Sequence, residues 1–117
     1  AIKGAMNPEN LNSLPHVREW LGHCRSATET VRERHGHLDK DNLAEVTCEN
    51  VLQQLQHLRT HPSVAVGLAN KRITLHGWVY DIGTGQMLCY NEETGSFDPM
   101  DEQYKALFAD VQSLKEA

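Results

Sequence analysis

One ten-residue run, at positions 73–82, constrains the fold more than any other part of the chain. It reads ITLHGWVYDI, and its β-branched and aromatic residues predict a β-strand. Ile73 and Val79 lie on one alternating face and Trp78 and Tyr80 on the other, so neither face is plainly solvent-like. A strand that is apolar on both faces is typical of α/β sheets that are covered on both sides. We therefore expect this strand to have pairing neighbours.

The rest of the chain predicts helices and one further strand. Apolar residues recur every three or four positions in several segments, which indicates amphipathic helices. Asn42-x-x-Glu45 can begin a helix as a capping box, Pro62 ends that helix and opens the next, and Asp98 followed by Pro99 begins the last one. The predicted elements are a loop over 1–12, helices over 14–35 (stopping at Gly36), 41–60 and 63–70, strands over 73–82 and 86–90 joined by a turn at 83–85, and a C-terminal helix over 99–117.

These elements leave the sheet short of strands. The strand at 73–82 gains one partner from the hairpin, and a lone hairpin is marginally stable in water. Either the sheet continues with another chain, or its other strands lie outside this sequence. The chain also begins at Ala1 without a Met, and we expect residues 1–117 to be a single partial domain of a longer protein.

Charge and cysteine content exclude several classes of protein. The 117 residues include 11 Lys and Arg against 16 Asp and Glu, a formal charge of −5, so we expect no nucleic-acid partner. No apolar run approaches the roughly 18–20 residues that span a bilayer, so we expect no membrane insertion. The three cysteines are an odd number without a C-x-x-C pair, which predicts a reducing cytoplasm.

Histidines and cysteines offer candidate chemistry, but no complete site. His57 and His61 are four residues apart, as metal ligands on one helix face would be. A pair of surface histidines explains them better, because the helix ends there before Pro62 and no H-E-x-x-H motif is present. His35 and His37 have the same two readings. Each cysteine (Cys24, Cys48 and Cys89) suits a packed small hydrophobe better than a nucleophile, because no base or orienting group accompanies it. Spacing and composition alone therefore predict no reaction.

Three segments resemble β-class carbonic anhydrases. Residues 75–85, LHGWVYDIGTG, are similar to that family's late strand motif, and residues 49–62, from Glu49-Asn50-Val51 to Pro62, are similar to its preceding long helix. Ala1-Ile2-Lys3-Gly4 resembles the residues directly after the family's H-x-x-C-G zinc motif. The order and spacing of the segments also match, over nearly all of residues 1–98.

The resemblance implies an α/β fold, with helices packed on a mainly parallel sheet that has an antiparallel edge strand. This chain would supply the last parallel strand and the antiparallel one. The family binds zinc through the motifs C-x-D-x-R and H-x-x-C, and neither motif occurs in residues 1–117. The resemblance therefore implies zinc as cofactor with its ligands upstream of Ala1, and no catalytic or metal residue within this segment.

The implied activity is the reversible hydration of carbon dioxide to bicarbonate by zinc-bound hydroxide, in a cytoplasmic homodimer or larger homo-oligomer, with carboxysome association in some bacterial relatives. Ala1, Ile2, Lys3 and Gly4 would then shape the wall beside the metal. Tyr80 matches a tyrosine that, in some members, belongs to a non-catalytic bicarbonate pocket, although a packed strand tyrosine is the alternative. The segment alone would be inactive. The competing hypothesis is a non-catalytic remnant that keeps the fold and binds a partner chain.

Overall fold

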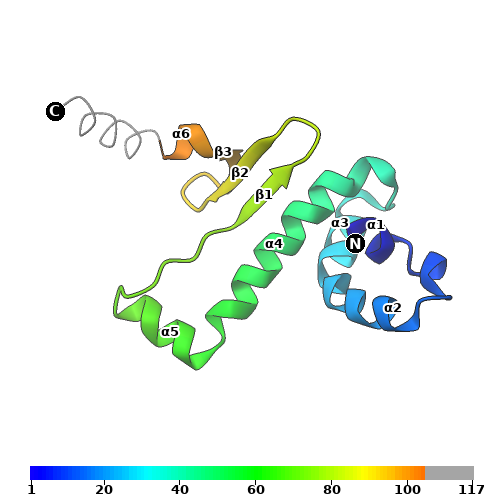
Figure 1. Ribbon diagram of the computed structural model, residues 1–117, viewed down its shortest axis with the longest axis horizontal. Coiled ribbons are helices and arrows are strands. Elements are labelled where there is room, and N and C mark those ends of the chain that lie inside the picture. The colour runs from blue at the N-terminus through cyan, green and yellow to red at the C-terminus, as the bar shows by residue number, and fades with distance from the viewer. Residues whose placement is uncertain (105–117) are drawn as a thin grey trace. The chain divides into compact units, whose positions relative to one another are not determined.

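A computed structural model describes residues 1–104, and Figure 1 shows their helices and strands. The chain divides into two compact units, the first over Ala1–Thr74 and the second beginning at Leu75. The first unit is helical and the second contains a small sheet, so the predicted α/β class is confirmed. None of the helices within residues 1–104 is long and apolar enough to cross a membrane. The part of the predicted C-terminal helix beyond Tyr104 lies outside the described residues.

The first unit contains five α-helices and three short 3-10 helices (η). In chain order they are α1 (Ile2–Met6), η1 (Pro8–Leu11), α2 (Pro15–Leu21), η2 (Gly22–Cys24), α3 (Arg25–His35), η3 (Lys40–Asn42), α4 (Leu43–Arg59) and α5 (Pro62–Ala69).

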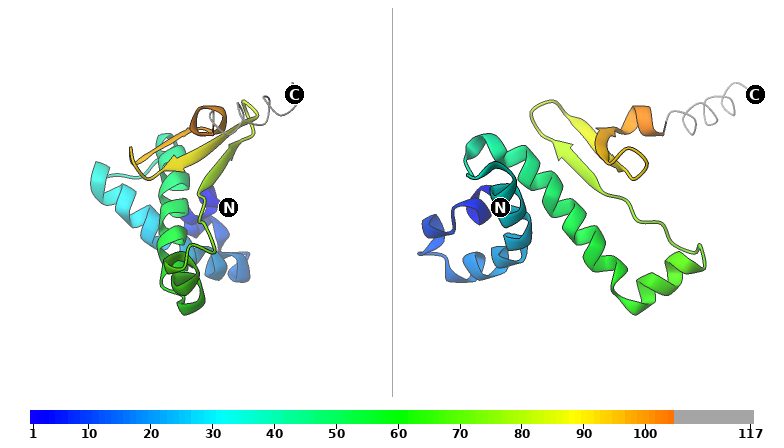
Figure 2. Two further views of the ribbon diagram at one scale, coloured as in Figure 1. Left: turned by 90° about the vertical axis from the view of Figure 1, so that its left-hand side faces the viewer. Right: turned by 180° about the vertical axis from the view of Figure 1, so that it is seen from behind.

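The core of the first unit lies where α1, α3 and α4 meet. Val31 of α3 and Val46 of α4 are fully buried, and Met6 of α1 packs with them. Both views in Figure 2 show α1 next to α3 and α4, in agreement with this packing. Partly buried residues extend the cluster: Ile2, Leu38 and Leu43.

The loop predicted over residues 1–12 is wrong. Ile2 and Met6 are four residues apart, so a helix places both side chains on one face, and burying that face against α3 and α4 stabilises α1. The Pro and Asn residues that suggested a loop come after this helix. Pro8 occupies the first position of η1, where a missing N–H costs nothing.

The continuous helix predicted over residues 14–35 is interrupted. The tighter turn η2 separates α2 from α3 and contains Gly22, a residue of low helix propensity. The predicted stop at Gly36 is confirmed, because Gly36 has a left-handed φ of +76° and its N–H donates to the carbonyl of Arg32 at 2.7 Å.

The start of the second long helix differs from the prediction in its cap. The capping box is formed by Asp39 with Asn42, at η3, and not by Asn42 with Glu45. The N–H of Asp41 donates to Asp39 Oδ1, and the N–H of Asp39 donates to Asn42 Oδ1, both at 2.9 Å. The helix α4 starts directly after η3 and ends at Arg59, and Pro62 opens α5, both as predicted.

The second unit is an antiparallel sheet with the strand order β1-β2-β3, formed by β1 (Trp78–Asp81), β2 (Gln86–Asn91) and β3 (Ser96–Pro99). The predicted hairpin is confirmed, with Trp78 opposite Cys89 and Asp81 opposite Gln86. The strand predicted over 73–82 is shorter than expected, because residues 73–77 lie outside the ladder. All described pairings are antiparallel, and the parallel part of the sheet stays a prediction.

Sequence patterns missed β3. Asp98 and Pro99 were expected to begin a helix, but both belong to β3, and the helix α6 (Met100–Gln103) starts one residue later. A proline is tolerated there because β3 is an edge strand, so its missing N–H interrupts no inner ladder. Cys89, in the central strand, is buried, whereas Trp78 and Tyr80 on β1 are exposed.

Candidate functional site at the N-terminal helix

The residues expected beside the active site, Ala1 to Gly4, belong to α1 or cap it. Ile2 and Met6 fix this helix, because their side chains pack with Val31 and Val46. Lys3 lies on another face and is exposed. The chain thus enters the first unit through a helix whose position is set by the core, which is the kind of support that a wall beside a reactive centre requires.

Gly4 allows α1 to approach α2 closely. A Cβ atom at this position would lie 3.1 Å from Leu21 Cδ1 and 3.2 Å from Leu11 Cδ1, closer than ordinary van der Waals contact. Leu21 is buried, so it has little room to move away. A Cβ at position 4 would therefore require the Leu21 and Leu11 side chains to shift by a few tenths of an ångström.

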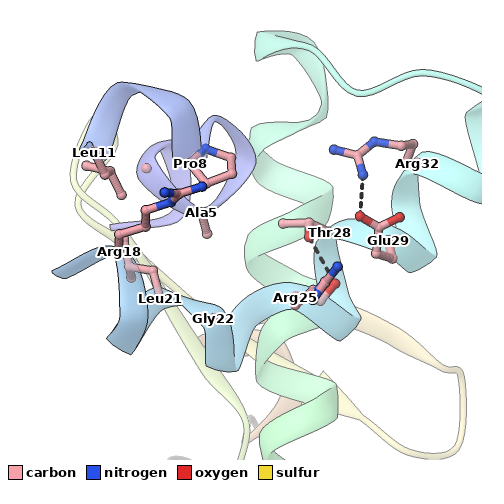
Figure 3. Close-up of a pocket in the computed structure, with 11 residues that line it drawn as sticks. Ala5, Pro8, Leu11, Arg18, Leu21, Gly22, Arg25, Thr28, Glu29 and Arg32 are labelled. Carbon is pink, nitrogen blue, oxygen red and sulfur yellow. Dashed lines mark hydrogen bonds and ion pairs between the residues drawn. The ribbon is translucent and has the colours of Figure 1, made fainter. Parts of the chain in front are cut away.

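A pocket of ≈ 340 Å³ opens beside α1, between η1, α2 and α3. Its lining residues shown in Figure 3 include three arginines, Arg18, Arg25 and Arg32, and one carboxylate, Glu29. Arg32 forms an ion pair with Glu29. Sequence reasoning missed this set, although a signal was present: the three arginines are spaced by seven residues, which places them near one face of a helix.

A second pocket, of ≈ 460 Å³, adjoins α1, and Gly4 lines both. Its wall combines charged and amide side chains: Lys3, Asn7, Asn10, Asp39 and Lys40. The N-terminal helix therefore borders two pockets that charged side chains line, which makes its surroundings the candidate functional site of the first unit.

The described residues do not fit a zinc site. Within residues 1–104, no group of three or more His, Cys, Asp or Glu side chains could hold a metal ion. His57 and His61 are both exposed, one in the last turn of α4 and the other capping α5. His35 Nε2 lies 2.6 Å from Glu45 Oε2, and His37 Nε2 lies 3.3 Å from Asp39 Oδ2, so each contacts a single carboxylate.

The cysteines are not activated nucleophiles. Burial raises the pKa of the Cys24, Cys48 and Cys89 thiols, and the nearby carboxylate of Glu45 raises that of Cys48 further. The thiolate is the reactive form, so a raised pKa lowers reactivity at neutral pH.

Ion pairs connect α3 to α4. Arg34 forms an ion pair with Glu45, and its Nη2 lies 3.6 Å from Glu49 Oε2. Two hydrogen bonds, the stronger from Arg34 and the weaker from His35, hold the pKa of the Glu45 carboxyl below its usual range. Glu45 and Glu49 therefore serve as helix-to-helix contacts and do not form an acid–base pair.

Tyr80, the other expected site residue, lies on β1 opposite Met87 and is exposed. It belongs to the second unit, whereas α1 and its pockets belong to the first. The residues expected to form the wall beside the metal and the residue expected to bind an inhibitory anion thus belong to different units.

Comparisons with known proteins agree with one another. Residues 1–87 match the family described as carbonic anhydrase. Carbonic anhydrase 1 of Escherichia coli O157:H7 is 41% identical over 91 residues, which cover 77% of this chain and 41% of that protein. Carbonic anhydrase of Synechocystis sp. is 37% identical over 93 residues, which cover 78% of this chain and 34% of that protein.

A solved structure is also similar. The structure of the beta-carbonic anhydrase CcaA superimposes with a TM-score of 0.77 at 32% identity, over 84% of this chain and 48% of that chain. This chain thus spans less than half the length of each of these relatives.

Proposed function

Because this chain belongs to the β-carbonic anhydrase family, we propose that the protein to which it contributes catalyses the reversible hydration of carbon dioxide to bicarbonate. The observation that supports this most is the family match, which extends over residues 1–87 and so includes α1, the long helix and most of the hairpin. The activity is proposed for a longer protein, since this chain spans 41% of its Escherichia coli relative.

We propose zinc as the cofactor, with its ligands upstream of Ala1. The family implies zinc, whereas the described residues hold no ligand group and the 117-residue sequence lacks both family ligand motifs. The contribution of this chain is therefore to support the site and not to bind the metal. On this proposal Ala1, Ile2, Lys3 and Gly4 form the wall beside the zinc, held in place by the packing of Ile2 and Met6.

Tyr80 is proposed as a contact of an inhibitory bicarbonate ion. Its exposed phenol group on β1 is free to donate a hydrogen bond to an anion oxygen. We expect Tyr80→Phe to weaken inhibition of carbon dioxide hydration by bicarbonate, while Tyr90→Phe on the neighbouring strand leaves it unchanged. Equal inhibition of the parent protein and the Tyr80 variant would assign this tyrosine a packing role.

A second candidate is a non-catalytic module that keeps the fold and binds a partner chain. The observation in its favour is that residues 1–104 contain no metal-binding group.

For the enzyme, we propose a cytoplasmic homodimer or larger homo-oligomer. Further strands would pair with the free edge of β1. If the source is a bacterium, we propose that the enzyme can also associate with carboxysomes.

The zinc content of the complete natural protein separates the two candidates. We expect about one zinc per chain, measured by atomic emission on the purified protein, together with carbon dioxide hydration in a stopped-flow pH-indicator assay. A zinc-free protein without hydration activity would favour the interaction module. As a control, the zinc chelator dipicolinate should abolish the activity, and added zinc should restore it.

A further inference from the structure

We infer that the arginine-lined pocket between α1, η1, α2 and α3 binds a small organic dianion, of the α,ω-dicarboxylate class, at a site that contains no zinc ligand. The pocket lies wholly within the first unit, and at ≈ 340 Å³ it falls in the lower part of the size range of small-molecule sites. The inference goes beyond the proposed hydration activity and does not depend on it.

The charge of the pocket favours an anion. Three guanidinium groups and one carboxylate line it, which leaves two positive charges in excess, although the whole chain carries a formal charge of −5. Within the described residues, neither Arg18 nor Arg25 forms an ion pair. Arginine stays charged at any physiological pH, and its planar fork matches a carboxylate.

The placement of the arginines favours a ligand with two anionic ends. In Figure 3, Arg18 extends toward Pro8 on one side of the pocket, whereas Arg25, Glu29 and Arg32 lie along α3 on the other side. Arg18 gives the first side one positive charge. On the second side, the ion pair of Arg32 with Glu29 leaves the charge of Arg25 unbalanced. Each side therefore has one charge for one anionic group.

Part of the pocket lining is apolar, which favours a carbon spacer. These apolar residues are Ala5, Pro8, Leu11 and the buried Leu21, and Gly4, Gly22 and Thr28 also line the pocket. The hydroxyl of Thr28 donates to the carbonyl of Arg25 at 2.9 Å, so its one donor is already used and does not compete for an anion. A short methylene chain would thus contact carbon atoms while its two carboxylates reach the guanidinium groups.

Titration calorimetry with dicarboxylates of increasing length, from malonate to pimelate, tests the inference on the complete natural protein. Low ionic strength is required, because salt screens exposed charges. We expect one spacer length to bind best, and about tenfold more tightly than the monocarboxylate of the same length. Binding that is equal for the two compounds, or absent for every dicarboxylate, would overturn the inference.

Variants locate the binding site. Arg18→Gln and Arg25→Gln should each remove the preference for the dicarboxylate, whereas Arg72→Gln, an exposed arginine outside the pocket that changes the charge equally, should retain it. Glu29→Gln releases Arg32 and should tighten binding about threefold. Circular dichroism verifies that each variant is folded. An Arg18 variant that keeps the full preference, or a Glu29 variant that binds more weakly, would contradict the assignment.

Discussion

Gly36 illustrates how one residue can end a helix through its backbone alone. Its φ is +76°, and no atom lies within 4 Å of the position that a Cβ would occupy, so a substitution there is opposed by conformation and not by packing. We expect Gly36→Ala to lower the free energy of unfolding by about 1–2 kcal/mol, measured by urea denaturation.

Gly22 supplies the matched control. It also has open space around its Cβ position, but its φ of −56° suits any residue. Gly22→Ala should leave the stability unchanged or raise it by about 0.4–1 kcal/mol, through the lower entropy of the unfolded chain. Equal losses in the two variants would show that the left-handed conformation of Gly36 is not what ends α3.

The carboxyl group of Glu45 should make stability depend on pH at acidic values. Arg34 and His35 lower its pKa in the folded state from an ordinary value of 4.5. A lowered pKa contributes stability that is present above pH 4.5 and is lost as the pH falls through the folded-state value. We expect carbon-detected NMR to give a Glu45 titration midpoint below 4.5, and Arg34→Gln to raise it.

The control for this titration is Glu33→Gln, which removes a neighbouring exposed carboxylate that makes no described ion pair. It should leave the Glu45 midpoint where it was. A Glu45 midpoint that does not respond to Arg34→Gln would refute the ion pair. The sequence could not predict this contact, because Arg34 and Glu45 are 11 residues apart and meet only when α3 packs on α4.

At the scale of elements, the capping box at η3 links the loop after α3 to the long helix α4. We expect Asp39→Ala to lower the free energy of unfolding by about 1 kcal/mol, because the N–H of Asp41 loses its acceptor. Lys40→Ala, at the adjacent exposed position, should have little effect. Thermal unfolding of both variants measures the difference, and an Asp39 variant as stable as the Lys40 variant would argue against the cap.

Elements with dense local signals could be predicted from the sequence. The repeated apolar residues of α4 and the proline that opens α5 needed no tertiary information, and neither did the turn that joins β1 to β2. Two errors share one cause, which is that tertiary contacts outweighed local preference. Packing on the core makes a helix of residues 2–6, and pairing with β2 makes a strand of Ser96–Pro99.

For the whole molecule, the small core predicts weak stability of the isolated 117-residue chain. Within residues 1–104, the core cluster of buried residues consists of Met6, Val31 and Val46. Trp78 and Tyr80 lie exposed on β1, which is an edge strand. Such an edge pairs readily with other chains. We expect sedimentation velocity to show association that increases with concentration.

Denaturant unfolding at several protein concentrations is a second test of this expectation. A monomer that unfolds in one sharp transition, at a denaturant concentration independent of protein concentration, would contradict this expectation. Ile82→Lys serves as a control, because it places a charge on an exposed residue next to β1 and should reduce association without altering the core.

Family membership could be predicted from the sequence because the HGWVYD stretch is specific in residue type, and the long-helix motif, weak by itself, precedes it in the expected order and spacing. The arginine-lined pocket could not, since it depends on where η1 lies relative to α2 and α3. Spacing by seven residues indicated a common helix face, but it did not indicate that this face closes against Pro8 and Leu11.

The short turn η2 has a consequence for the evolution and engineering of this protein. Arg18 precedes it, whereas Arg25 and Arg32 come after it. Each residue added to a helical segment rotates the rest of the helix by about 100°. One alanine inserted after Gly22 would therefore put the two groups of arginines out of phase, with every charge still present. The length of Gly22–Cys24 thus sets the orientation of Arg18 relative to Arg25 and Arg32 about the helix axis. Insertions in this turn should therefore disturb the arginine-lined pocket more than substitutions do.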